Sequence, residues 1–340
     1  MSFDLNIIWF LILGLVLSGY AILDGFDLGV GALHLFTKTD DERRIMLNSI
    51  GPVWDGNEVW LVVSGGVMFA AFPDVYATVF SGFYPIIMLI LVSLIFRAVA
   101  IEFRSKHPST TWRKMWDIAF SLSSIFIAFL FGMSLANVII GVPINVEKEY
   151  IGGIINLLNP YSILLGITTV ALFMMHGSIY VVMKTENEMH KKIRGWVNNS
   201  IIFFVICYIT TTMATLIYYP HLALPFKNHP ILFFIAILNM LAIANIPRQI
   251  SKGEDFYAFL SSSISIAALM GIVGIGVFPN LVLSSVNSLY NLNIYNSASS
   301  HKTLSIILIV ACIGLPSVLS YTGAVYWIFR GKVKIDSRSY

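Results

Sequence analysis

The residues with the clearest capacity for chemistry are seven charged side chains in or beside three apolar stretches: Asp24, Asp27, Asp55, Glu58, Arg97, Glu102 and Lys106. Asp24 and Asp27 are three positions apart, as are Asp55 and Glu58, so each pair shares one face of a helix. Charge inside hydrocarbon is costly, and the side chains that carry it usually face protein or water. Such groups mark proton or ion pathways, or they form buried ion pairs.

Two uses of these charges remain open on the residues alone. Six are candidates for a proton pathway, because carboxyl and amino groups can carry protons: Asp55, Glu102, Lys106, Asp24, Asp27 and Glu58. The alternative use is structural, since Asp55 and Glu58 would also be stabilised by the dipole of a helix N-terminus. Arg97 is a candidate for a structural ion pair with Asp27 or Glu102. No residue of this chain is predicted to be catalytic.

The composition predicts a polytopic membrane protein that is all-α. Hydrophobic residues make up 57% of the chain and charged residues 11%, and the mean hydropathy is +0.80, whereas soluble domains carry about 25% charged residues. A net charge of +3 gives no reason to expect a nucleic acid partner. About 20 apolar residues span a bilayer as a helix. Nine runs of this kind are expected to be transmembrane helices: 7–35, 52–72, 78–102, 117–140, 161–183, 200–219, 231–248, 257–278 and 303–329.

The basic residues predict the orientation of these nine helices. Most Lys and Arg residues fall in the loops after helices 1, 3, 5 and 7 and in the C-terminal tail. The alternate loops contain only Lys148, Lys227 and Lys302. The positive-inside rule therefore places the N-terminus outside and the C-terminus in the cytoplasm. In this orientation all seven charged groups lie towards the cytoplasmic side, where Glu102 and Lys106 have the i, i+4 spacing of an ion pair if their helix continues that far.

We expect one membrane domain over residues 1–340. It is interpreted as a four-helix unit over 1–140, a second over 161–278 and a ninth helix over 303–329. The Asn- and Ser-rich stretches 141–160 and 279–302 are expected to be surface caps. Three glycines surround Asp27, and small residues let helices approach closely: Gly25, Gly29 and Gly31.

His176 is the histidine most clearly inside an expected helix, and it is the only weak candidate for cofactor binding. A haem ligand is one reading, but a hydrogen-bonded structural histidine is preferred because His176 has no partner at ligand spacing. The sequence has no His-x-x-x-His or Cys-x-x-Cys pair, so no metal site is predicted. Cys207 and Cys312 lie in apolar runs and are expected to be buried as small hydrophobic residues.

Five motifs resemble those of a known family. Residues 24–31 read DGFDLGVG, 42–60 read ERRIMLNSIGPVWDGNEVW, and 69–85 read FAAFPDVYATVFSGFYP; FRSK follows at 103–106 and WRKMWD at 112–117. In this order they closely resemble subunit II of the cytochrome bd-type terminal quinol oxidases, which use ubiquinol or menaquinol. The resemblance covers the whole chain in topology and is strongest over residues 20–145.

The resemblance implies a respiratory complex in a bacterial cytoplasmic (inner) membrane. A partner subunit I would carry two b-type haems and one d-type haem, or a variant set of b-type haems. The complex would oxidise quinol and reduce dioxygen to water with protons taken from the cytoplasm. Subunit II would bind no haem; it would contact lipid, and it could hold a structural quinone and a small accessory single-helix subunit.

The resemblance also suggests roles for individual residues. Asp55 of the WDGN motif matches the path carboxylate of the family, and Glu102 and Lys106 resemble its entrance groups. Asp24 and Asp27 match its helix 1 acids. Two other classes remain as alternatives: an ion- or proton-coupled secondary transporter, and a purely structural assembly subunit. The transporter is disfavoured because it needs access from both sides, whereas these charges gather near one side.

Overall fold

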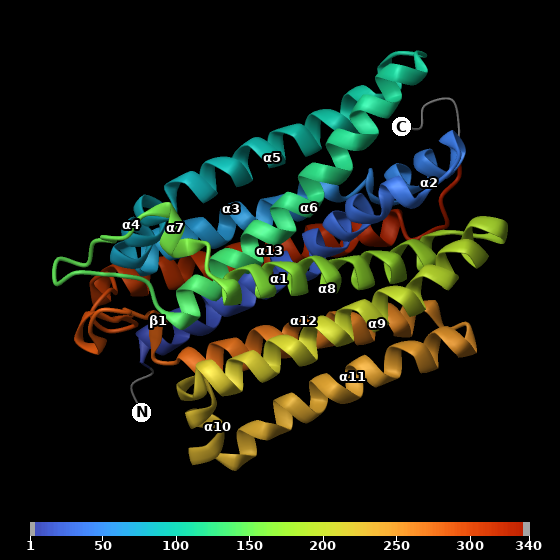
Figure 1. The fold of residues 1–340 in the computed structure, drawn as a ribbon. Helices are drawn as coiled ribbons and strands as arrows, with labels where there is room; N and C mark the ends of the chain where they lie inside the picture. Colours follow the sequence, from blue (N-terminus) through green and yellow to red (C-terminus); the bar gives the residue numbers. More distant parts are fainter. Residues whose placement is uncertain (1–3, 336–340) are drawn as a thin grey trace.

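The structure, a computed structural model, describes residues 4–335 and is an elongated bundle of long helices (Figure 1). The long helices are α1 (Leu5–Leu33), α3 (Trp54–Ala71), α5 (Tyr84–Phe103), α6 (Thr110–Ile140), α8 (Pro160–Lys184), α9 (Asn187–Tyr218), α11 (Phe233–Lys252), α12 (Asp255–Val277) and α13 (His301–Ile328). Eight of the helices in this described part are long and apolar enough to cross a membrane. The expectation of an all-α polytopic membrane protein is confirmed.

Helix α3 is the long helix that is not among those eight. It corresponds to the expected run 52–72, but it has 18 residues and carries Asp55, Asn57 and Glu58 in its first turns. These polar residues lower its hydropathy, because a window long enough to span a bilayer must include them. Its membrane crossing therefore stays a prediction.

Short elements join the long helices. They are the 3₁₀ turns η1 (His34–Phe36), η2 (Arg104–Lys106), η3 (Pro220–Ala223), η4 (Pro230–Leu232) and η5 (Ser288–Tyr290), the helices α2 (Asp40–Ile50), α4 (Pro73–Gly82), α7 (Ile154–Leu157) and α10 (Leu224–Asn228), and the antiparallel strands β1 (Asn280–Val282) and β2 (Leu292–Asn293). The expected run 78–102 is broken at Phe83, since Pro73 and Pro85 each occupy the first turn of a new helix. The expected run 200–219 begins earlier, at Asn187, because hydropathy marks the apolar part of a helix and not its polar first turns.

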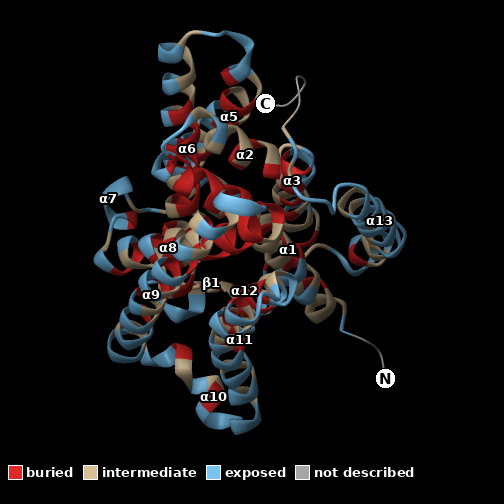
Figure 2. Cartoon of the chain, turned by 90° about the vertical axis from the view of Figure 1, so that its right-hand side faces the viewer, coloured by how far each residue is buried: buried red, intermediate tan, exposed pale blue. Residues whose placement is uncertain are grey.

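The core of the bundle surrounds α1, which packs against α3, α6, α8 and α12. Every residue of α1 from Asp24 to Leu33 is buried. The backbones of α1 and α8 meet at two glycines: a Cβ added to Gly177 would lie 2.6 Å from the carbonyl carbon of Gly29. Figure 2 shows the buried residues concentrated around these central helices, whereas α13 is exposed along almost its whole length, with Leu304 as its single buried residue.

Helix α2 lies in what the sequence presented as a polar loop. Thr39 and Glu42 form a capping box at its N-terminus, and Met46, Leu47 and Ile50 bury its apolar face. Glu42 also accepts a hydrogen bond of 2.7 Å from Lys192 on α9. The helix therefore covers the end of the bundle at which α3 begins.

The stretches 141–160 and 279–302 pack on one another at the opposite end. The Val142 N–H donates to the Leu283 carbonyl at 2.9 Å, and the Ser285 N–H donates back to the Val142 carbonyl at 2.9 Å. Lys148 joins this layer to α4, because its Nζ donates to Asp74 at 2.5 Å and to the Asn296 carbonyl at 2.6 Å. These contacts close the end of the bundle away from α2.

Candidate functional site

Arg97 on α5 lies at the centre of the predicted charged residues, and its side chain is 1% exposed. Its Nη1 donates to Asp24 Oδ1 on α1 at 2.7 Å, and its Nη2 donates to Glu58 Oε2 on α3 at 2.9 Å. One guanidinium thus joins three helices. The sequence suggested Asp27 or Glu102 as its partner, but packing turns Asp24 towards α5.

Asp27 on α1 is buried and contacts α3 instead. Its Oδ2 accepts a hydrogen bond of 2.7 Å from Nδ2 of Asn57, which also donates to the Leu23 carbonyl at 3.2 Å. The Oδ1 of Asn57 in turn accepts from the Tyr326 hydroxyl on α13 at 2.8 Å. Asn57 is part of the WDGN motif, which signals its importance, whereas nothing in the sequence connects Tyr326 with Asp27.

The acidic residues follow a gradient of exposure from the surface to the core. Asp55 is exposed in the first turn of α3, one helical turn before Glu58, and their charges are close enough to interact. The Glu58 side chain is 23% exposed, and beyond Arg97 the Asp24 side chain is fully buried. Arg97 therefore contacts both Asp24 and Glu58, and Asp55 lies at the exposed end of this series of acids.

Three buried oxygens at this site lack a hydrogen bond of ordinary geometry within residues 4–335: Asp24 Oδ2, Asp27 Oδ1 and Tyr20 Oη. All three belong to α1. The Tyr20 hydroxyl is nevertheless close enough to Asp24 for the two side chains to interact. Buried polar atoms of this kind are usually satisfied by internal water. The site therefore has acceptors for water on the same helix that supplies its innermost carboxylates.

Glu102 and Lys106 lie at the end of α5. Glu102 is half-buried in the last turn of the helix, and Lys106 is exposed in η2. The α-helical geometry that the i, i+4 pair required ends at Phe103, before Lys106. Glu102 is five positions beyond Arg97, which is about 7.5 Å along a helix. Glu102 and Lys106 therefore lie at the end of the bundle where α3 begins with Asp55 and Glu58.

A second cluster of buried charges, centred on Asp117 of α6, was not predicted. Arg104 donates from Nε to Asp117 Oδ1 at 2.6 Å and from Nη2 to Asp40 at 2.7 Å. His34 Nε2 and Arg43 Nη1 also contact Asp117, at 2.7 and 3.0 Å. The sequence did carry a signal for this cluster, because the FRSK motif contains Arg104 and the WRKMWD motif contains Asp117. The cluster ties the end of α1 to α2, α5 and α6.

His176 on α8 has both ring nitrogens in hydrogen bonds. Nε2 lies 3.0 Å from the Ile22 carbonyl, which can only accept, so Nε2 carries the proton. Nδ1 lies 2.7 Å from the Ser262 hydroxyl, which also lies 2.8 Å from the Phe259 carbonyl. The ring also stacks on Phe259. A haem or metal ligand needs a free ring nitrogen, so the donor set does not fit that role. The described residues contain no cluster of three or more His, Cys, Asp or Glu side chains placed to hold a metal ion.

Proteins of one known family resemble this chain over nearly its whole length. A family model described as cytochrome bd terminal oxidase subunit II matches residues 5–329. The chain is 34% identical to cytochrome bd-I ubiquinol oxidase subunit 2 of Escherichia coli (strain K12), covering 97% of this chain and 95% of the relative. It is 32% identical to cytochrome bd ubiquinol oxidase subunit 2 of Bacillus subtilis (strain 168), covering 97% of each.

The fold also matches a solved structure, the bd oxidase from Geobacillus thermodenitrificans, with a TM-score of 0.80. That match covers 96% of this chain and 98% of the other at 17% identity, so it shows the shared fold alone. The evidence for the family comes from the near-complete family match and the two relatives above 30% identity. This chain belongs to the cytochrome bd terminal oxidase subunit II family.

Proposed function

We propose that this chain is the haem-free subunit II of a bd-type quinol oxidase and that its acidic residues contribute to proton uptake. The curated relatives carry the name of a ubiquinol oxidase subunit, which supports quinol as the reductant. Quinol oxidation supplies electrons, and reduction of dioxygen to water consumes protons. A subunit that contacts the aqueous phase with a line of acids fits the second requirement.

The observation that carries this proposal is the gradient from exposed Asp55 through Glu58 to buried Asp24. Carboxyl groups exchange protons with water, and buried unpaired oxygens bind the water that carries them. Arg97 cannot release its proton in a protein. It therefore positions Asp24 and Glu58, and the carboxyl groups and water carry the proton past it.

The proposed orientation follows from the charges. We place nine helices across the membrane, with α3 as the second, the N-terminus outside and the C-terminus in the cytoplasm. The units 1–140 and 161–278 and the ninth helix at 303–329 remain our proposed division. Asp55, Glu102 and Lys106 then lie at the cytoplasmic end, where protons enter.

Haem binding is assigned to the partner. The family resemblance implies that subunit I carries two b-type haems and one d-type haem, or a variant set of b-type haems. The hydrogen bonds at both ring nitrogens of His176 support this assignment. Helix α13 supports such a partner, since it is apolar and almost wholly exposed. A structural quinone, a single-helix accessory subunit and a bacterial inner-membrane location are proposed on the family resemblance.

Asp55→Asn in the assembled oxidase tests the proton role. We expect oxygen consumption to fall by at least about tenfold, while the haem difference spectrum stays normal. A positioned proton-transfer group typically contributes about 10²–10⁴-fold, and water can replace part of the contribution of an exposed one such as Asp55. Asp41→Asn is the matched control, because Asp41 is an exposed acid on neighbouring α2. A full rate with normal spectra in Asp55→Asn would reject the role and leave a purely structural subunit.

A further inference from the structure

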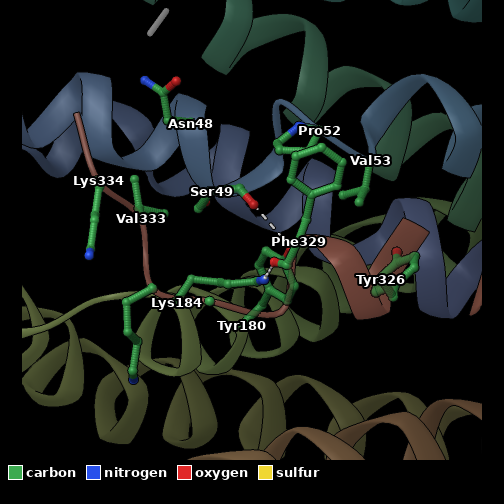
Figure 3. A pocket seen from close by; sticks show the side chains of 12 residues that line it. Asn48, Ser49, Pro52, Val53, Tyr180, Lys184, Tyr326, Phe329, Val333 and Lys334 are labelled. Atoms are coloured by element: carbon green, nitrogen blue, oxygen red, sulfur yellow. Dashed lines mark hydrogen bonds between the residues drawn. The ribbon is translucent and has the colours of Figure 1, made fainter. Parts of the chain in front are cut away.

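A cavity of about 200 Å³ lies where the turn between α2 and α3 meets the C-terminal ends of α8 and α13. Figure 3 shows its lining, with Asn48 and Ser49 on one side and Tyr180 and Lys184 of α8 on the other. The segment after α13 closes it: the Val333 N–H donates to the Lys184 carbonyl at 2.9 Å. The cavity is therefore built from three separate stretches of the chain, 48–53, 180–184 and 326–334.

Lys184 is the buried cation of this cavity. The residue is 7% exposed, and its Nζ donates to the Phe329 carbonyl and lies 5.8 Å from the centre of the Tyr180 ring. No carboxylate forms an ion pair with it in residues 4–335. A carbonyl dipole and an aromatic face compensate a buried ammonium only in part, because buried charges are normally paired.

Two more lysines, Lys332 and Lys334, line the same cavity, and none of its described lining residues is acidic. Lys184 is buried at this cavity, and Lys332 and Lys334 are exposed on the segment that closes it. Three positive charges in this region repel hydronium and other cations, so a proton entrance is the wrong use for it. They attract an anion, and several ammonium donors together suit the multiple oxygens of phosphate.

We propose that this cavity binds a phosphate group, supplied either by the headgroup of an anionic lipid or by a soluble phosphate. It lies where α8 and α13 end, at Lys184 and Ile328, which in our orientation is the level of the cytoplasmic headgroups. Basic groups at that level are attracted to anionic lipid. The inference goes beyond the proton role and does not rest on it, because binding is measured without turnover.

The experiment titrates the delipidated, assembled oxidase with three probes: short-chain phosphatidylglycerol, short-chain phosphatidylcholine and inorganic phosphate. We expect phosphatidylglycerol to bind more tightly than phosphatidylcholine. Lys184→Met and the double variant Lys332→Gln/Lys334→Gln should each weaken phosphate-group binding by about tenfold, the usual effect of losing a charge-assisted hydrogen bond. The double variant leaves the Lys184 contact with Phe329 intact, so it reports on binding even if Lys184→Met loosens the chain after α13.

Lys191→Met is the matched control, because Lys191 lies on α9, outside the lining, with a side chain 75% exposed. It should bind all three probes as the unmodified oxidase does. Inorganic phosphate that competes fully with phosphatidylglycerol would identify a soluble source, and phosphatidylglycerol binding without competition would identify the lipid. Absence of binding by both anionic probes, or affinities in the lysine variants equal to the unmodified oxidase, would overturn the proposal.

Discussion

Arg97 joins one acid of α1 to one acid of α3 inside the bundle. Its guanidinium contacts Asp24 at 2.7 Å and Glu58 at 2.9 Å, and neither its own side chain nor that of Asp24 is open to solvent. A planar fork with several donors can hold two carboxylates at once, which a lysine ammonium does with less defined geometry. The residue is therefore a positioning group for two members of the candidate pathway.

Arg97→Met should strongly destabilise the assembled complex. The change leaves Asp24 buried without its cation, and breaking a buried pair by removing one partner costs about 3–5 kcal/mol. Thermal unfolding of the purified complex measures the effect. Arg97→Lys is the matched variant: it keeps the charge and should recover part of the loss. A Met variant that unfolds at the same temperature as the unmodified complex would show that Asp24 is not held as an ion.

The spacing of the acids predicted which residues share a helix face, but not which of them meet. Sequence alone cannot fix the rotation of α1 against α5, and so it could not choose between Asp24 and Asp27 as the partner of Arg97. The contact between His34 and Asp117 spans 83 positions, and no helical periodicity connects residues so far apart. The sequence therefore placed Asp24, Glu58 and Arg97 at the same end of the bundle, but it could not show that they pair with one another.

Among the elements, α2 has a charged residue, Glu42, in the capping box at its N-terminus. The Glu42 carboxylate accepts from Lys192 and from the N–H groups of Lys38 and Thr39. Partial burial would raise the pKa of Glu42, but these hydrogen bonds outweigh it and lower the pKa below its ordinary value of 4.5. A carboxyl group with a lowered folded-state pKa stabilises the fold above its unfolded pKa and loses that effect as pH falls through the folded value.

Glu42→Gln should therefore reduce stability at neutral pH and have little effect in acid. Glutamine keeps the capping-box acceptor for the backbone but loses the ion pair with Lys192, so the expected loss at pH 7 is about 1 kcal/mol or less. Thermal unfolding of the complex at several pH values measures it. The gap between the two proteins should close as pH falls below 4.5. A gap that stays constant with pH would mean that the Glu42 charge contributes nothing.

The elements that the sequence predicted best are long helices with uniformly apolar sequences. Long apolar runs gave α8, α12 and α13 to within two residues at each end, because a membrane imposes length and composition together. Helix α2 was not predicted because it buries only three apolar residues, Met46, Leu47 and Ile50, and most of its other residues are polar. The first turns of α9 were missed for the same reason: they are polar and helical, and hydropathy does not register them.

In the whole molecule, the two ends of the bundle differ in the residues and segments that form them. One end has the exposed acids of α3, the lysine-lined cavity and α2, and the other is closed by the interlocked stretches 141–160 and 279–302. Helix α13 lies on the outside with one buried residue. A partner or lipid must cover its apolar surface, since exposed apolar surface of this extent is unfavourable in water.

The proposed orientation predicts which loops face each compartment. After replacement of Cys207 and Cys312 by alanine, a membrane-impermeant maleimide added to intact spheroplasts should label the Lys227→Cys variant and spare Lys252→Cys. Both lysines are exposed, on α10 and at the end of α11. Labelling of Lys252→Cys alone would reverse the orientation and move the acids to the outer surface.

The central claim is that the carboxyl groups of this chain take part in proton uptake, and one measurement tests it most directly. The assembled oxidase is reacted with dioxygen in a stopped-flow instrument, and a pH-sensitive dye reports proton uptake in the unmodified protein, Asp55→Asn and Asp27→Asn, with Asp74→Asn at the opposite end as control. We predict slower uptake in the first two variants, normal haem spectra in all, and an unchanged rate in Asp74→Asn. Uptake at the unmodified rate in both Asp55→Asn and Asp27→Asn would contradict the account.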